Sequence, residues 1–438
     1  MTLFGVKVPH RKNTKDKKPL EMSAPGLMYY PASQHIGAPA KPVVKVGDQV
    51  KIGSVLFEAG GFVSSPIYSS VSGKVKKIED MLQSNGSYVP CVVVENDGEN
   101  TVSEDVKAPD VHDYDSFIDA VKASGVVGLG GAGFPTAVKL GVGDISRIEV
   151  VVVNGAECEP YITSDTRTML DRSEDISEGI HLLRKYLGVK KVVIGIENNK
   201  PQCIAEMKKM AEGHDGVVEV KALPSIYPQG GEKVLVYNST GRIIEEGKLP
   251  IDAGVVVINC TTLAAVASYV RDGMPLVRKC VTVDGSAVKE PQNVIVPIGT
   301  PAAAVFDFCG GFKSEPAKVL YGGPMMGVSL SDLNAPVIKQ TNALLAFDEK
   351  DAIPKKTTSC IRCGRCTNTC PFGLAPVSFA KAYEQNDMEM LEKLHANLCM
   401  ECGCCAYACP AGIPLVQKNK LAKAALASYL KKKKEENK

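Results

Sequence analysis

The chain has 438 residues, of which 45% are hydrophobic, and a formal net charge of +2. Single hydrophobic cores stop growing near about 250 to 300 residues, so this length predicts roughly two to four domains. The nearly balanced charge gives no basic field that would favour nucleic acid as a partner. The N-terminus lacks the pattern of a signal peptide, and the longest low-charge run, residues 254–270, is too short and too polar to span a bilayer. We therefore expect a multidomain protein that does not cross a membrane by itself.

The first predicted module covers about residues 35–79 and contains KPVVKVGDQVKIGSVLFEAGG. This segment resembles a lipoyl or biotinyl barrel-sandwich domain. A carrier domain of that kind needs a lysine at the tip of a hairpin, yet no lysine lies between Lys51 and Lys74. We therefore expect a docking or packing module and not a carrier.

Residues 114–270 alternate apolar runs with helical patterns. The runs are IEVVVVN, KVVIGIE, VVEVKAL and AGVVVIN. This alternation predicts a mostly parallel sheet with helices on its faces. Ligands bind such sheets at the carboxyl ends of the strands. Polar residues follow two of these ends, in NGAECEPYITSD from Asn154 and in NCTTLAAV from Asn259.

A glycine-rich loop, GVVGLGGAGFPTAVKLG, precedes the first of these runs. Gly128, Gly130 and Gly133 match G-x-G-x-x-G, although the loop follows a predicted helix and not the strand of a dinucleotide fingerprint. Pro135 suits the first turn of a following helix, whose free N–H groups would hold a phosphate, and Lys139 would add a positive charge. The alternative is a turn whose glycines serve the backbone alone.

Nine of the 15 cysteines lie in two blocks, CIRCGRCTNTCP from Cys360 and CMECGCCAYACP from Cys399. Each block is C-x2-C-x2-C-x3-C-P, the run that wraps a 4Fe-4S cluster while its fourth cysteine ligates the neighbouring cluster. Two structural zinc sites are the alternative, but these usually show separate C-x2-C pairs. Cys404 falls outside the register, so we expect it to pack. The crossed pattern predicts one cluster on Cys360, Cys363, Cys366 and Cys409, and another on Cys399, Cys402, Cys405 and Cys370.

Four motifs occur in the order GLGGAGFPTAVK, NGAECEP, YPQGGEKVL and NCTTLAAV, and the doubled cysteine motif follows them. This series resembles the flavoprotein subunit of respiratory complex I and, more closely, the RnfC family of Rnf electron-transport complexes. The resemblance covers nearly the whole chain, including GGPMMG from Gly322. It implies a multidomain α/β chain with four parts. These are an N-terminal barrel-sandwich β domain at 1–110, a Rossmann-like FMN/NADH-binding domain at 111–272, a β-grasp (SLBB) domain at 273–345, and a helical two-cluster ferredoxin-like domain with a basic tail at 346–438.

The resemblance also implies a cofactor site, because in the complex I family the glycine loop holds FMN and NADH stacks over the flavin. Phe134 and Glu157 would lie near the nicotinamide nucleotide. Glu157 and Glu159 would accept hydrogen bonds from ribose hydroxyls, with surface carboxylates as the alternative. The chain departs from the complex I pattern at Ala156, where that pattern has an acid, and at Cys260, which replaces an asparagine. Carried over by motif, the site contains Gly128, Gly130, Gly131, Gly133, Phe134, Lys139, Asn154, Glu157, Glu159, Tyr227, Gly230, Gly231, Glu232, Asn259 and Thr262.

The function implied is that of an enzyme component, the peripheral NAD(H)-reactive subunit of a membrane-bound ferredoxin:NAD oxidoreductase. FMN would exchange hydride with NAD(H) and two 4Fe-4S clusters would pass on single electrons, so no catalytic side chain is expected. The implied partners are other Rnf subunits, including an iron-sulfur subunit and integral membrane subunits, which would hold the chain at the cytoplasmic side of the cell membrane. No nucleic-acid partner is expected. The alternatives are a diaphorase subunit of a soluble hydrogenase or formate dehydrogenase, and a non-catalytic iron-sulfur scaffold.

Overall fold

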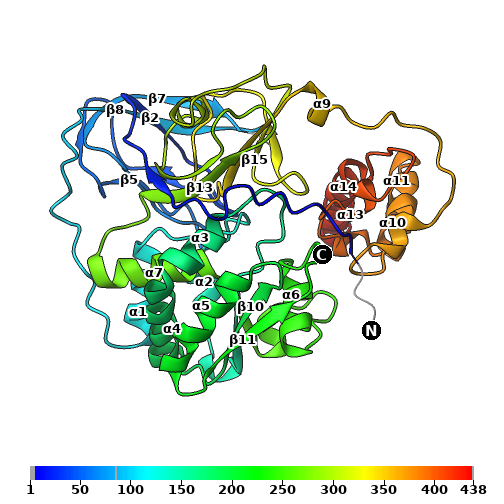
Figure 1. Ribbon diagram of the computed structural model, residues 1–438, viewed down its shortest axis with the longest axis horizontal. Coiled ribbons are helices and arrows are strands. Elements are labelled where there is room, and N and C mark those ends of the chain that lie inside the picture. Colours follow the sequence, from blue (N-terminus) through cyan, green and yellow to red (C-terminus); the bar gives the residue numbers. More distant parts are fainter. Residues whose placement is uncertain (1–4, 84–85, 437–438) are drawn as a thin grey trace.

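The computed structural model describes residues 5–83 and 86–436. Figure 1 shows a barrel and a second β region side by side above an α/β region, with a cysteine-rich helical region at one end. None of the helices in these two ranges is long and apolar enough to cross a lipid bilayer. The α/β region and the β region above it meet along the face that carries the candidate site.

The barrel-sandwich region consists of two small antiparallel sheets packed around Met28, Tyr30, Leu56 and Phe57, which are all fully buried. One sheet has the order β2-β8-β7-β4 and the other the order β3-β5-β6. The strands are β2 (Leu27–Pro31), β3 (Lys41–Pro42), β4 (Gln49–Val50), β5 (Val55–Glu58), β6 (Ile67–Tyr68), β7 (Gly73–Leu82) and β8 (Tyr88–Asn96).

The α/β region is built on a four-stranded parallel sheet with the order β11-β10-β9-β12. Its strands are the four predicted apolar runs: β9 (Val150–Asn154), β10 (Val192–Glu197), β11 (Val218–Leu223) and β12 (Val255–Asn259). Alternate residues of β9 face opposite sides, and both sides are covered. Val151 and Val153 pack in the larger core, while Val150 and Val152 pack against Leu235. Burial on both faces explains why the runs are continuously apolar.

Helices cover both faces of this sheet. The larger core contains residues of α1 (Tyr114–Ala123), α4 (Ser173–Leu187), α5 (Pro201–Ala211) and α7 (Cys260–Asp272), and α6 (Glu232–Thr240) packs on the other face. The remaining elements of the region are α2 (Thr136–Leu140), α3 (Ser164–Asp171) and the 3-10 helices η1 (Ile145–Arg147), η2 (Glu212–His214) and η3 (Pro250–Ala253).

The β-grasp region has a six-stranded sheet with the order β1-β14-β13-β17-β15-β16. Its first strand comes from the N-terminal segment: β1 pairs in parallel with β14, and Met22 lies in the core of this region. The elements are β1 (Leu20–Glu21), β13 (Arg278–Asp284), β14 (Gln292–Pro297), α8 (Ala302–Phe308), β15 (Lys318–Tyr321), β16 (Val328–Leu330) and β17 (Ala343–Phe347). The chain therefore crosses the β-grasp region before it forms the barrel.

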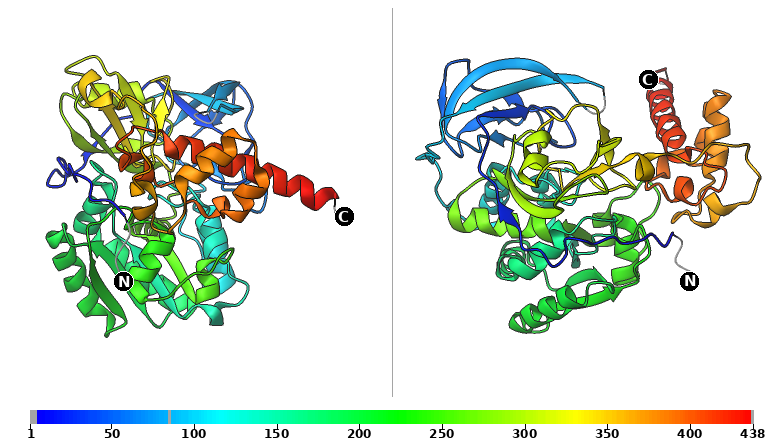
Figure 2. Two further views of the ribbon diagram at one scale, coloured as in Figure 1. Left: turned by 90° about the vertical axis from the view of Figure 1, so that its right-hand side faces the viewer. Right: turned by 45° about the horizontal axis from the view of Figure 1, so that its top comes forward.

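The cysteine-rich region packs its helices around Phe379, Leu391, Ala422 and Leu426. Residues 353–364 have no regular structure; they connect the short helix just after β17 to the other helices of the region and arc around the outside of the molecule in Figure 1. The last helix points away from the rest of the chain in Figure 2. The elements are α9 (Glu349–Ala352), α10 (Arg365–Asn368), α11 (Pro376–Glu384), α12 (Met388–Lys393), η4 (Ala396–Leu398), α13 (Cys404–Tyr407) and α14 (Leu415–Glu436).

Candidate functional site

A cavity of about 1360 Å3 lies at the carboxyl ends of β9 and β12, between the α/β and β-grasp regions. Open α/β sheets bind ligands at this edge. The cavity wall contains every sequence-predicted cofactor residue except Gly133, so the structure brings together Gly128, Gly130, Gly131, Phe134, Lys139, Asn154, Glu157, Glu159, Tyr227, Gly230, Gly231, Glu232, Asn259 and Thr262. We call this space the flavin cavity, after the cofactor that the sequence predicts for it.

Gly133 has a structural role behind the cavity wall. Its φ angle is +67°, a conformation that side chains rarely adopt, and a Cβ atom there would collide with the side chain of Gln340. Glycine at this position therefore allows the loop to turn tightly and to approach the β-grasp region.

The glycine loop carries free backbone donors at the cavity wall. Its shape is set by hydrogen bonds from the Gly128 amide to the Phe134 carbonyl (2.8 Å) and from the Leu129 amide to Oγ1 of Thr262 (2.9 Å). Within the described ranges, the amides of Gly130 and Gly131 donate no hydrogen bond. A Cβ atom on Gly130 would lie 3.0 Å from Nδ2 of Asn259, so a larger residue there would intrude on the site. Unpaired amides and close backbone approach fit a phosphate group.

Two asparagines end neighbouring strands and organise the floor of the cavity. Asn154 donates to the carbonyl of Gly230 (3.0 Å). Asn259 accepts from the amide of Thr262 (3.1 Å), which caps α7, and donates to Oδ2 of Asp165 (2.8 Å). Asn154 therefore connects the end of β9 to the loop at Gly230, and Asn259 connects the end of β12 to α3.

Glu157 is buried, and its carboxylate is engaged by the first turn of α3. It accepts from the Asp165 amide (2.7 Å) and from Oγ1 of Thr166 (2.6 Å). Burial raises the pKa of Glu157, while the nearby ammonium of Lys12 opposes this shift. Both oxygens of Glu157 thus already accept hydrogen bonds from α3, and the contact with a ribose hydroxyl stays a prediction.

Glu159 joins the α/β region to the GGPMMG loop of the β-grasp region. Its carboxylate accepts from the amides of Met325 (3.0 Å) and Met326 (2.8 Å). Burial raises the pKa of Glu159 to about 7, and the two amides oppose that shift. The side chain therefore holds the roof of the flavin cavity and titrates near neutral pH.

Lys139 lies on the five-residue helix α2 and pairs with Glu232 on α6 at 2.6 Å. Two residues predicted to contact the cofactor are thus partners of each other across the cavity wall. The positive charge predicted for the phosphate is already compensated within the chain.

The eight predicted cluster cysteines gather in two sets. Within the described residues, no three His, Cys, Asp or Glu side chains converge closely enough to hold a single metal ion. Instead, each set surrounds a space, of about 210 Å3 in the first case and a narrower 20 Å3 in the second. Four soft sulfur donors around a space suit an iron-sulfur cluster. The first set is Cys360, Cys363, Cys366 and Cys409, and the second is Cys370, Cys399, Cys402 and Cys405. Cys404 lines the second space as well.

The second set adjoins the flavin cavity. Met400, between two of its cysteines, lines that cavity as well. Tyr227 donates to the carbonyl of Cys402 (2.8 Å), and the thiol of Cys404 donates to the carbonyl of Tyr227 (3.7 Å). Cys404 therefore has a hydrogen-bond partner at this contact, and its packing role stays a prediction. The first set lies farther out, with Cys360 exposed to solvent.

Comparisons with known proteins match each region of the chain. Family models fit the RnfC barrel sandwich hybrid domain at residues 3–99, the Nuo51 FMN-binding domain at 121–268, the SLBB domain at 280–329 and a 4Fe-4S dicluster domain at 356–413. The chain is 41% identical over 400 residues to the C subunit of the proton-translocating ferredoxin:NAD(+) oxidoreductase complex of Clostridium ljungdahlii, covering 90% of this chain and 86% of that protein. The chain belongs to the RnfC family.

Two further members of the RnfC family are similar to this chain at about the same level of identity. The C subunit of the Na(+)-translocating ferredoxin:NAD(+) oxidoreductase complex of Acetobacterium woodii is 42% identical, with 90% of this chain and 89% of that protein covered. The C subunit of the ion-translocating oxidoreductase complex of Rhodobacter capsulatus is 40% identical, with 95% and 81% covered. Among solved structures, a chain of an NAD+-reducing [NiFe]-hydrogenase in the H2-reduced state is 20% identical with a TM-score of 0.50, covering 72% of this chain and 63% of that one. That likeness concerns the fold alone.

The family assignment confirms the predicted resemblance and fold class, and it confirms the predicted cofactors, FMN and 4Fe-4S clusters. It also confirms an oxidoreductase subunit, as opposed to an iron-sulfur scaffold without a flavin. The individual residues of the sites stay predictions.

Several residues at the RnfC site were missed by the sequence analysis. Asp165 lies in the polar stretch after β9 and lines the cavity, so its position offered a local signal. Asn342 and Met400 also line it but come from distant regions, and Lys12 donates to the carbonyls of Glu157 (2.8 Å) and Glu159 from the N-terminal segment. No local pattern marks these three residues.

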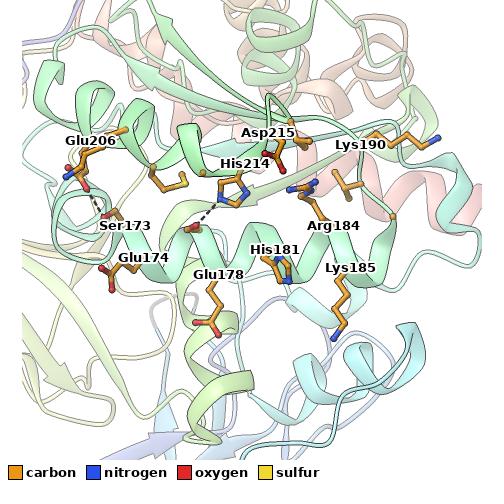
Figure 3. A pocket seen from close by; sticks show the side chains of 17 residues that line it. Ser173, Glu174, Glu178, His181, Arg184, Lys185, Lys190, Glu206, His214 and Asp215 are labelled. Carbon is orange, nitrogen blue, oxygen red and sulfur yellow. Dashed lines mark hydrogen bonds between the residues drawn. The ribbon is translucent and has the colours of Figure 1, made fainter.

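Figure 3 shows a separate pocket beside α4 and α5, lined by polar and charged side chains that include Arg184, Lys185 and Asp215. Some of its lining residues form hydrogen bonds with each other: Ser177 with His214 (2.9 Å) and Ser173 with Glu206 (2.8 Å). None of the sequence-predicted site residues lines it. The flavin cavity, and not this pocket, therefore contains the predicted site residues.

Proposed function

We propose that this chain is the NAD(H)-reactive subunit of a ferredoxin:NAD oxidoreductase complex, with FMN in the flavin cavity and a 4Fe-4S cluster on each cysteine set. One observation carries this proposal: the flavin cavity adjoins the loop of the second cysteine set. Met400 belongs to that loop and lines the cavity, and Tyr227 lines the cavity and donates to the carbonyl of Cys402. A site for hydride chemistry and a site for single electrons are thus adjacent.

Bound FMN supplies the exchange between a hydride and single electrons. The chain's own residues bind and orient it. The free amides of Gly130 and Gly131 would donate to the phosphate, and the absence of a side chain on Gly130 leaves room beside Asn259. Asn154 and Asn259 bond to Gly230 and Asp165 at the strand ends, while Glu159 holds the GGPMMG loop of the β-grasp region through its backbone amides. These residues would position the cofactor.

The positions of the two cysteine sets imply an order for electron transfer between them. The second set lies against the flavin cavity through Met400, and the first set lies beyond it with Cys360 and Cys363 exposed. The second set therefore serves as the inner site and the first as the outer site. A partner protein would exchange electrons at the surface around Cys360.

For partners, we propose an iron-sulfur subunit and integral membrane subunits that hold this chain at the cytoplasmic side of the membrane. The relatives are named as subunits of complexes, which supports the general assignment. Co-purification with membrane subunits, as opposed to a soluble hydrogenase or formate dehydrogenase, tests this part. We also propose the domain limits 1–110, 111–272, 273–345 and 346–438, with β1 exchanged into the sheet of the third domain.

The deciding experiment is a cofactor inventory of protein purified without oxygen. The wild-type chain should contain FMN and about eight irons. Gly130→Leu should lose FMN and retain its iron, because the side chain would enter the space beside Asn259. The matched control is Gly26→Leu, since Gly26 is exposed and a Cβ atom there meets nothing within 4 Å. Full FMN content in Gly130→Leu would move the flavin to another part of the chain.

A further inference from the structure

Two lysines of the β-grasp region are buried beside the glycine loop, outside the set predicted from sequence. Lys339 has no exposed surface, and Lys279 on β13 is 4% exposed. Buried ammonium groups are normally paired with a carboxylate. Neither lysine forms an ion pair in the part of the chain that the structure describes. Both charges therefore need another explanation.

Both ammonium groups are hydrogen-bonded to backbone carbonyls of the glycine loop and its approach. Lys279 donates to the carbonyls of Leu129 (2.8 Å) and Lys339 (2.9 Å). Lys339 donates to the carbonyl of Gly125 (2.7 Å), and also to Ser65 and Pro66 of the barrel region. The two lysines thus join three regions of the chain behind the loop.

These bonds determine where the loop amides point. In a trans peptide, the carbonyl of one residue and the N–H of the next point in opposite directions. Because Lys279 holds the Leu129 carbonyl, the N–H of Gly130 points away from that lysine. Asn342, which lines the cavity, donates to the Gly130 carbonyl (3.2 Å), so the N–H of Gly131 points away from Asn342. The amides of Gly130 and Gly131 donate no hydrogen bond within the described residues, and both glycines line the flavin cavity.

We infer that Lys279 and Lys339 are positioning residues for the phosphate of the flavin: they hold the loop carbonyls away from the cavity and place buried positive charge behind its free amides. This inference rests on the proposed FMN site and deepens it. Its consequence is selectivity, because a phosphorylated flavin compensates the buried charge and riboflavin does not. Loss of the lysine charge should therefore weaken the binding of FMN much more than that of riboflavin.

The surroundings of the two lysines also link flavin binding to protons. Burial lowers the pKa of Lys279 to about 7, opposed by Asp165 on α3 and by the neighbouring Cys280. Burial lowers the pKa of Lys339 to about 7 as well. The titratable group that faces Lys339 is His35 of the barrel, and the pKa of His35 is lowered by its burial and by the charge of Lys339. A bound phosphate dianion favours the charged lysines and raises their pKa values. At pH 8, FMN binding should therefore take up protons.

The test compares the affinities of FMN and riboflavin for full-length protein that retains its clusters but has been stripped of flavin. Quenching of flavin fluorescence measures both dissociation constants. In Lys279→Met, FMN affinity should fall about tenfold or more, because the variant removes both the buried positive charge behind the free amides and the hydrogen bond that holds the Leu129 carbonyl, while riboflavin affinity changes by less than about twofold. Lys318→Met is the matched control, because Lys318 is exposed on the same sheet.

A merely structural role would weaken both ligands equally, and either that result or an unchanged FMN affinity overturns the inference. Calorimetry at pH 8 in buffers of different ionisation enthalpy gives a second readout: Lys279→Met should take up fewer protons than wild type when it binds FMN. An equal uptake also counts against the inference. If Lys339→Met does not fold, Lys279→Met still decides the question. Failure of the proposed site is recognised separately, because Gly130→Leu would then bind FMN like wild type.

Discussion

The phenol of Tyr227 donates a hydrogen bond to the carbonyl oxygen of Cys402 at 2.8 Å, although the two residues are 175 positions apart. Tyr227 is 2% exposed and lines the flavin cavity, while Cys402 belongs to the inner cysteine set. One side chain thus connects the site of hydride exchange with the site that accepts single electrons. The contact fixes the cysteine-rich region against the α/β region.

Tyr227→Phe should loosen this contact. The substitution leaves the buried carbonyl of Cys402 without its donor, at a cost of about 1–3 kcal/mol. We expect NADH to reduce the flavin as in wild type but to reduce the clusters more slowly, as followed by stopped-flow absorbance. Tyr88→Phe is the control, since Tyr88 is exposed on the barrel. Unchanged cluster reduction in Tyr227→Phe would show that the hydrogen bond does not support electron transfer.

Cys370→Ser should damage the inner cluster. Cys370 lies in the first cysteine block but lines the second cavity, so its loss should reduce the iron content from about eight to about four. Electron paramagnetic resonance of the dithionite-reduced protein should show the outer cluster intact. Cys404→Ser is the control and should retain about eight irons, because Cys404 bonds to the Tyr227 carbonyl. Loss of the outer cluster in Cys370→Ser would contradict the crossed pattern.

Glu159 should make stability depend on pH. Its folded-state pKa of about 7 exceeds its ordinary value of 4.5, so the folded chain binds more protons between these values. This contribution is complete below about pH 4.5 and is lost as the pH rises to about 7, with a total of about 3 kcal/mol. Denaturation at pH 5, 6 and 7 should show the slope, and Glu159→Gln should reduce it. An infrared carboxylic acid band that titrates near pH 7 should be absent from Glu159→Gln.

Lys12→Met should destabilise the loop after β9. The ammonium of Lys12 donates to the carbonyls of Glu157 (2.8 Å) and Glu159 (2.9 Å), which the variant leaves buried without this donor. We expect the thermal midpoint to fall, by an amount equivalent to about 1–3 kcal/mol. Lys15→Met is the control, because Lys15 is exposed on the same segment. Equal midpoints for the two variants would assign Lys12 no role in holding the loop.

Much of the candidate site could be predicted because its residues follow recognisable local patterns. Asn154 and Asn259 each end an apolar run, and parallel strands bring such ends to one edge of the sheet. Gly133 matched the same glycine motif as Gly130, yet it faces Gln340 and not the cavity. The motif could not separate the two roles, since the residue that Gly133 contacts belongs to another region.

The local elements follow from the amino-acid sequence alone: the four buried strands, the glycine loop and the two cysteine blocks. Each depends on residues a few positions apart, through apolar periodicity, backbone freedom or ligand spacing. Three long-range relationships become visible only in the folded chain: β1 joins β14, Lys279 holds the carbonyl of Leu129, 150 positions away, and Tyr227 reaches the inner cysteine set. Burial and hydrogen bonding act between surfaces that meet only after the chain has folded, and no local pattern encodes which surfaces will meet.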